Sequence, residues 1–207
     1  MAVVESKAPV SRKPAVVRQR ILDAAQAEFT AHGFAAASTN RILERFGGSK
    51  PTMFRYYPTK KALFAAVVER IAQGWSGDGP WRACAAPEPW LTGFTMHAAA
   101  WITRDENIFV GRMAIAEGTA FPEVGAIYRN LVTEPMQHLL AGQLASWTAQ
   151  GLLACADAPG DAVRFLDLAL SGLVSRQLYA VAPPLDDRAI AVHAAEVVAL
   201  FLRGRAR

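Results

Sequence analysis

Three closely spaced segments of the sequence have the polar residues of a helix start but lack the acidic residues that usually follow. Ser38, Ser49 and Thr59 each precede a short apolar pattern, and hydroxyl side chains cap the first N–H groups of a helix. The next residues are Thr-Asn-Arg, Lys-Pro-Thr and Lys-Lys, although an acid there would stabilise the positive end of the helix dipole. Because N–H groups, a hydroxyl and a lysine can bind a phosphate, the three starts together predict contacts with a DNA backbone. For any single start, the alternative is an ordinary helical corner with solvated lysines.

Two of the predicted helices, 39–46 and 50–57, form a helix-turn-helix with Gly47 at the turn. The second helix of such a motif enters the major groove, with its N-terminal residues at the base edges. Arg55 is suited to a guanine, and the hydroxyls of Tyr56 and Tyr57 to phosphates. The predicted DNA-binding residues are Ser38, Thr39, Arg41, Ser49, Lys50, Thr52, Phe54, Arg55, Tyr56, Tyr57 and Lys60.

The charge distribution agrees with a partner that meets only the first third of the chain. Residues 1–73 contain 12 Lys and Arg against 5 Asp and Glu, and the remainder contains 10 against 13. A basic segment on an acidic remainder indicates a polyanion at the basic part, and a chance imbalance of surface charge is the alternative. With two distant cysteines and no apolar run long enough to cross a bilayer, we expect a reduced, cytoplasmic protein without a disulfide, zinc site, other cofactor or membrane partner.

The periodic patterns are helical throughout, which predicts an all-α protein with an N-terminal three-helix domain and a C-terminal helical domain. Gly33 should end the first helix, and Phe34 should fold back onto its apolar stripe. Residues 1–16 are expected to form a flexible basic arm, 17–73 the DNA-binding domain and 74–89 a linker rich in glycine and proline. In the domain 90–207, helices are expected near 88–103, 107–117, 122–150, 161–181 and 187–203.

Residues 19–64, QRILDAAQAEFTAHGFAAASTNRILERFGGSKPTMFRYYPTKKALF, resemble the N-terminal domain of the TetR family of transcriptional regulators. The resemblance implies three DNA-binding helices, a fourth linking helix, and a divergent C-terminal domain that binds a ligand and dimerises. Larger residues at Leu43 and Phe46, where the family usually has alanine, could widen the angle between the two helices of the motif. Pro51 stands where glycine is common and removes one backbone donor. The segments Ala116-Glu117 and Phe121-Pro122-Glu123 resemble the AefR-like subgroup.

Large and polarisable side chains gather after the expected linker, and such walls suit a small apolar or aromatic effector. The alternative for each residue is that it belongs to the core. The predicted ligand-binding residues are Phe94, His97, Trp101, Phe109, Met113, Glu117 and Trp147.

The last two helices are more apolar than one small subunit can readily cover, so we expect them to pair with their copies as a four-helix bundle. Burial inside a monomer is the alternative. The predicted interface residues are Phe165, Ala169, Leu170, Leu173, Val174, Val197, Val198 and Phe201. The sequence therefore predicts a homodimeric repressor that is released from a palindromic DNA operator by a small effector. A small helical enzyme is an alternative, although the four histidines lack metal-ligand spacing and no catalytic motif is evident. A nonspecific DNA-coating protein is another, although it would not explain the acidic C-terminal domain.

Overall fold

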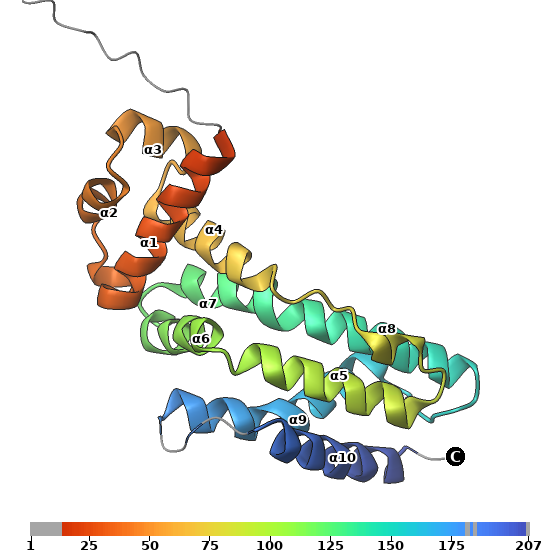
Figure 1. Ribbon diagram of the computed structural model, residues 1–207. Helices are drawn as coiled ribbons and strands as arrows, with labels where there is room; N and C mark the ends of the chain where they lie inside the picture. Colours follow the sequence, from red (N-terminus) through yellow and green to blue (C-terminus); the bar gives the residue numbers. More distant parts are fainter. Residues whose placement is uncertain (1–13, 181–182, 184–185, 206–207) are drawn as a thin grey trace, which may run out of the picture. The chain divides into compact units, whose positions relative to one another are not determined.

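The computed structural model describes residues 14–180, 183 and 186–205, and within these ranges all regular structure is helical. This confirms the all-α prediction. The chain divides into two compact units, one up to Val67 and the other from Val68 onward (Figure 1). Residues 1–13 of the predicted arm lie outside the described residues, and helix α1 begins at Pro14, inside the range expected for that arm. No helix among the described residues is long and apolar enough to cross a membrane.

The N-terminal unit contains α1 (Pro14–Ala36), α2 (Thr39–Phe46), α3 (Lys50–Tyr56) and the start of α4 (Lys60–Ala72). Gly33 interrupts α1 with a φ of 73°, a left-handed conformation that favours glycine. The chain turns there, so that the ring of Phe34 stacks on Phe29 at 6.1 Å between centroids. Phe64 meets both rings edge-on at 5.3 Å. These three buried rings hold the first and fourth helices together and confirm the predicted role of Phe34.

The C-terminal unit contains a short 3-10 helix (Pro80–Ala83), α5 (Pro87–Ile102), α6 (Asp105–Glu117), α7 (Pro122–Tyr128), α8 (Glu134–Ala149), α9 (Ala158–Leu178) and α10 (Asp187–Arg203). Helix α8 packs along α9, and α10 packs along α5 (Figure 1). Asp186 caps α10 by accepting the N–H of Ala189 at 2.7 Å.

Two expectations for this unit need correction. Residues 74–89 were expected to be a linker, but the buried Trp81 contacts Trp90 and Phe94 at ring distances of 4.7 and 5.5 Å. Trp81 therefore attaches this segment to the core of the C-terminal unit. Residues 122–150 were expected to form one helix, but a π-helical turn at Arg129–Thr133 separates α7 from α8. Pro135, at the start of α8, has no N–H to donate, so an unbroken α-helical hydrogen-bond pattern is impossible there.

The start of α9 is fixed by a buried acid. Asp161, only 2% exposed, accepts hydrogen bonds from Arg205 at 2.6 and 3.1 Å and from Arg164 at 2.8 Å. The hydrogen bonds from Arg205 lower the pKa of Asp161 more than burial raises it, and Arg164 lowers it further. The charged pair thus joins the residues that follow α10 to the first turn of α9.

Candidate nucleic-acid interface and internal cavity

The three helix starts have the capping bonds that the sequence predicts. Ser38 Oγ accepts the N–H of Arg41 at 3.5 Å, and Ser49 Oγ accepts the N–H of Thr52 at 3.3 Å. Thr59 Oγ1 accepts the N–H of Ala62 at 3.0 Å. None of the three first turns contains an acid. The positive ends of α3 and α4 therefore lack the local negative charge that usually accompanies them, whereas the start of α2 meets the carboxylate of Glu28 from α1.

The turn between α2 and α3 is built on two glycines. Gly47 adopts the left-handed conformation (φ 65°, ψ 33°) and closes α2 with a bond from its N–H to the carbonyl of Leu43. A side chain at Gly48 would overlap the ring of Phe46, which is only 4% exposed. Arg20, from α1, donates to the carbonyl of Phe46 at 2.7 Å. The end of α2 is thus held from both sides, and this fixes where α3 begins.

Helix α3 buries one apolar side chain and presents the basic ones. Met53 is 1% exposed and faces the core, whereas Lys50 and Arg55 are exposed. Lys50 Nζ lies 5.9 Å from the Phe54 ring centre, and the Arg55 guanidinium lies 5.4 Å from that of Tyr56. Phe54, next to Met53 in the sequence, is only half-buried.

Arg18 is a further basic residue at this surface that sequence reasoning missed. Its guanidinium lies 5.4 Å from the centre of the Tyr56 ring. The sequence prediction for α1 used only its apolar stripe. Two arginines, Arg18 and Arg55, therefore share one aromatic ring. The position of Arg18 near the start of α1, on the polar side of the apolar stripe, could have indicated this role.

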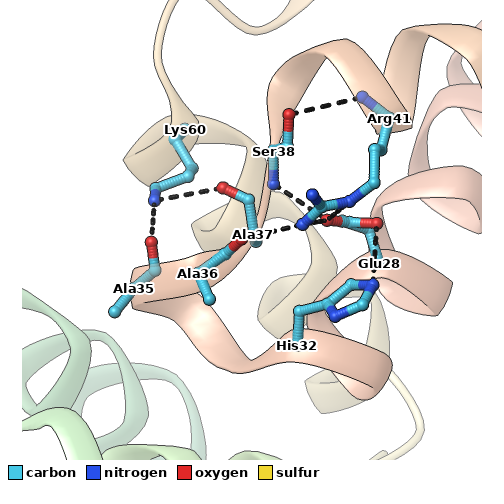
Figure 2. Close-up of polar contacts among 8 residues, drawn as sticks. All are labelled: Glu28, His32, Ala35, Ala36, Ala37, Ser38, Arg41 and Lys60. Carbon is cyan, nitrogen blue, oxygen red and sulfur yellow. Dashed lines mark hydrogen bonds and ion pairs between the residues drawn. The ribbon is translucent and has the colours of Figure 1, made fainter.

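A group of polar contacts, here called the Glu28 clamp, fixes the connection between α1 and α2 (Figure 2). Glu28 is 2% exposed. Its Oε1 accepts the backbone N–H of Ser38 at 2.9 Å and Nε–H of Arg41 at 2.8 Å. Arg41 also donates to the carbonyl of Ala36 at 2.8 Å, and Nε2 of His32 lies 3.7 Å from the second carboxylate oxygen. The clamp therefore ties the side of α1 to the first turn of α2.

Lys60 completes the support of the same connection. Its Nζ donates to the carbonyls of Ala35 at 2.9 Å and Ala37 at 3.3 Å, and it lies 5.0 Å from the centre of the Phe34 ring. Arg41 and Lys60, both predicted as DNA contacts, also bind the chain itself. Lys60 has three donors and Arg41 has five, so each retains capacity for a phosphate.

The electrostatics of the clamp favour a charged Glu28. Burial alone would raise the pKa of the Glu28 carboxyl, but hydrogen bonds from Arg41 and from the Ser38 N–H, with the charge of Arg41, hold it below its usual value. The same contact raises the pKa of Arg41. The pair is therefore ionised at neutral pH, and the connection before α2 is held by a charge-assisted contact.

The predicted ligand-binding residues are not among those that line the cavity described below. Phe94, Trp101 and Trp147 are at most 2% exposed, and Trp90 contacts both Phe94 and Trp147 at about 5.4 and 5.3 Å between ring centres. The indole N–H of Trp147 is bonded to the carbonyl of Ala85. Among the remaining predicted residues, Met113 is buried, and the half-buried ones are His97, Phe109 and Glu117. The core alternative describes the three large aromatic residues, because they fill space for one another.

A cavity of about 180 Å³ lies elsewhere in the C-terminal unit, partly open at its mouth. It lies among α5, the segment from α7 to α8, and α9. Its ten lining residues are Ile102, Tyr128, Thr133, Met136, Gln137, Leu166, Asp167, Leu170, Ser171 and Val174. The available signal was the polar pairs Thr133/Gln137 and Asp167/Ser171, each one helical turn apart within an apolar pattern. Sequence reasoning followed the aromatic residues instead.

The predicted dimer residues on α9 and α10 lie mostly inside the subunit. Seven of them are at most 9% exposed within one subunit, and the eighth, Val174, lines the cavity. A residue already covered inside the subunit adds little area to a contact with a second one. Four other large apolar side chains of these two helices are 38–56% exposed. They are Val163, Leu168, Val192 and Leu200.

Comparison with known protein families decides the identity. Residues 89–204 match the model described as the AefR-like transcriptional repressor, C-terminal domain. Residues 21–67 match the model for bacterial regulatory proteins of the TetR family. The chain belongs to the TetR family. Transcriptional regulation, not enzymatic catalysis, is what this family does.

Similar curated proteins share the N-terminal part of this TetR regulator. Over 60 residues it is 40% identical to the HTH-type transcriptional repressor SCO4008 of Streptomyces coelicolor. The aligned segment is 29% of this chain and 31% of that protein. Over 65 residues it is 35% identical to the HTH-type transcriptional regulator RutR of Escherichia coli K12, with 31% of each chain covered. The chain thus matches about a third of the length of these relatives.

Solved structures match the TetR regulator over nearly its whole length. The Flavonoid-responsive Regulator FrrA superposes with a TM-score of 0.80 at 23% identity, covering 93% of this chain and 98% of that one. A putative TetR-family regulator from Mesorhizobium loti gives 0.77 at 20% identity, covering 95% and 100%. At such identities the likeness establishes the fold alone.

Proposed function

We propose that this TetR regulator is a repressor that binds a palindromic operator as a homodimer and is released by a small apolar or aromatic effector. The observation that carries the proposal is the set of three capped, acid-free helix starts beside an exposed basic face on α3. A DNA phosphate supplies the negative charge that the ends of α3 and α4 lack. DNA binding of this kind implies a bacterial cytoplasmic protein.

In this proposal, residues 17–73 bind DNA, and each exposed side chain of α3 has a separate task. Arg55 reads a base edge, since an arginine pairs with two acceptors of guanine. Lys50 and the hydroxyls of Ser49 and Tyr56 hold phosphates, which positions the helix without reading sequence. Arg18 adds a phosphate contact beside Tyr56.

The homodimer forms through the outer faces of α9 and α10. Leu168 and Leu200 are 41% and 56% exposed, and Ser171 and Gly172 on α9 present little bulk, so two helices can approach closely. Two recognition helices about 34–36 Å apart then reach successive major grooves on one side of DNA. A palindromic operator follows from this two-fold symmetry.

The effector binds in the C-terminal unit, within residues 90–207. Its binding changes the distance between the two DNA-binding domains of the dimer. Release requires that the effector bind the DNA-free geometry more tightly than the DNA-bound one. By linkage, operator DNA must then weaken effector binding by the same factor.

The deciding experiment is a genomic selection of bound DNA fragments, followed by binding measurements with wild-type protein and Arg55→Ala. The wild type should protect one short palindrome. Arg55→Ala should lose about 1–3 kcal/mol on that site and discriminate less at one base pair of each half-site. A footprint that spreads over DNA of any sequence would instead identify a nonspecific DNA-coating protein.

A further inference from the structure

The cavity of the C-terminal unit is sized for one small ring. Its volume is about 180 Å³, whereas an apolar cavity of about 150 Å³ is enough to hold benzene. Larger multi-ring compounds would require the surrounding helices to move apart. A single ring with a short substituent is therefore the largest ligand that this geometry accepts unchanged.

The walls combine an apolar floor with polar groups. The apolar lining comes from Ile102, Met136, Leu166, Leu170 and Val174. Burial raises the pKa of Tyr128, so its phenol is neutral at physiological pH. A ring on these surfaces gains the free energy of leaving water, while the polar groups select its substituent.

Two of the polar groups stand at the π-helical turn. Thr133 ends this turn and donates its hydroxyl to the carbonyl of Arg129 at 3.0 Å. Gln137 follows one helical turn later and lines the same cavity. Single π-helical turns frequently occur at functional sites, and this one interrupts the helix beside the cavity.

The charge at the cavity is negative. Asp167 is exposed and is the acid among the lining residues, which include no Lys, Arg or His. Arg129 pairs with Glu134 at 3.5 Å, and Arg112 donates to the carbonyls of Gln177 and Leu178. These two basic groups on the adjoining elements are thus committed to other partners, and a ligand meets the charge of Asp167.

We propose that the cavity takes a one-ring compound carrying a protonated amine, with Asp167 as its counter-ion, and disfavours carboxylates. This rests on the effector-responsive function proposed above and specifies its ligand class. The ring occupies the space between Met136 and Leu170, and the ammonium group points to the mouth. Because Asp167 is exposed, solvent screens the ion pair and the charge preference is modest.

The test uses three probes that share a phenyl ring but differ in charge: benzylamine, benzyl alcohol and benzoate. The full chain is labelled with ¹³C at its methionine methyl groups, and the Met136 signal is assigned from Met136→Leu. Met136 lines the cavity, whereas Met53 lies in the core of the N-terminal unit, so Met53 is an internal control. Benzylamine should shift the Met136 signal, leave the Met53 signal in place, and bind about two- to fivefold more tightly than benzyl alcohol. Benzoate should bind more weakly than the alcohol.

Two variants assign the effect to the site. Asp167→Asn should remove the preference for the amine over the alcohol, whereas the matched control Glu69→Gln, an exposed acid on α4, should keep it. Leu170→Trp should fill the cavity and abolish the Met136 response to all three probes.

The inference is overturned if benzoate binds as tightly as benzylamine, if Asp167→Asn keeps the amine preference, or if no probe shifts Met136. Operator binding by the same proteins is measured separately. An amine-selective Met136 response without operator binding would reject the proposed repressor function but keep the cavity assignment. Operator binding without that response would reject the cavity assignment but keep the proposed repressor function.

Discussion

The carboxylate of Glu28 lies 2.6 Å from the guanidinium of Arg41, and it also accepts the backbone N–H of Ser38. One buried acid on α1 thus holds both the cap residue of α2 and a side chain of its first turn. Helix α2 in turn sets the start of α3 through Gly47 and Gly48. The orientation of the helix-turn-helix therefore depends on a buried residue of the preceding helix.

Replacing this acid should weaken the N-terminal unit. Glu28→Gln keeps the shape but removes the charge, and it should lower the free energy of unfolding by on the order of 1–3 kcal/mol, because the Arg41 and Ser38 donors lose their charged acceptor. Urea unfolding followed by circular dichroism measures this. The exposed Glu44→Gln on α2 is the control. Equal stability of the two variants would show that the clamp contributes nothing.

Acid should destabilise the protein through two carboxylates. Glu28 and Asp161 both have a pKa below the usual values of 4.5 and 3.8. A group with a lowered folded-state pKa adds stability above its unfolded pKa and loses it as the pH falls through the folded pKa. Stability should therefore fall as the pH drops below about 4.5, toward the lowered values. Urea midpoints measured from about pH 6 to pH 3 should decline less steeply for Glu28→Gln and Asp161→Asn. Slopes identical to the wild type would contradict the assignment.

Alanine substitutions at Lys60 and Lys61 distinguish the loss of a structural hydrogen bond from the loss of a positive charge alone. Both substitutions with alanine remove one positive charge, but only Lys60 donates to the carbonyls of Ala35 and Ala37. Lys60→Ala should lower the melting temperature of the N-terminal unit and weaken binding to all DNA sequences, with a salt slope lower by about one unit. Lys61→Ala should leave the melting temperature nearly unchanged. The interpretation fails if the two variants melt alike.

The outer faces of α9 and α10 should control assembly. Glutamate at Leu168 or Leu200, which are 41% and 56% exposed, should place a charge in the proposed interface and give monomers that retain their helicity. Sedimentation velocity and circular dichroism measure the two properties. Leu173→Glu is the comparison, because Leu173 is 6% exposed and a buried charge there should unfold the subunit. A Leu168→Glu, Leu200→Glu double variant that still sediments as a dimer would move the interface elsewhere.

Local features were predictable from the sequence because a few adjacent residues determine them. The caps at Ser38 and Ser49, the end of α2 at Gly47 and the bounds of α10 were all predicted and are confirmed. Each depends on hydrogen bonds between residues within four positions of one another. Tertiary contacts were not accessible in this way. Glu28 and Arg41 are both polar, and nothing in their spacing indicated that the acid is buried.

The cavity was missed for a related reason. Aromatic side chains such as Phe94 and Trp147 suit both a pocket wall and a packed core, and only the relative positions of the helices decide between them. The residues that line the cavity are as distant in sequence as Ile102 and Val174. Pro135 was a local signal for the break near Thr133, and it should have divided the helix expected at 122–150.

The close contact between Phe46 and Gly48 links the variation allowed at the two positions. Any side chain at Gly48 collides with the ring of Phe46, and that buried ring cannot swing outward without uncovering the core. A library that varies residue 48 alone should return glycine almost exclusively. A library that also varies residue 46 should recover alanine or serine at 48 together with a smaller residue at 46. Chains that diverge from this one should therefore change the two sites jointly, and the order of the changes is constrained: the ring must shrink before the glycine can be replaced.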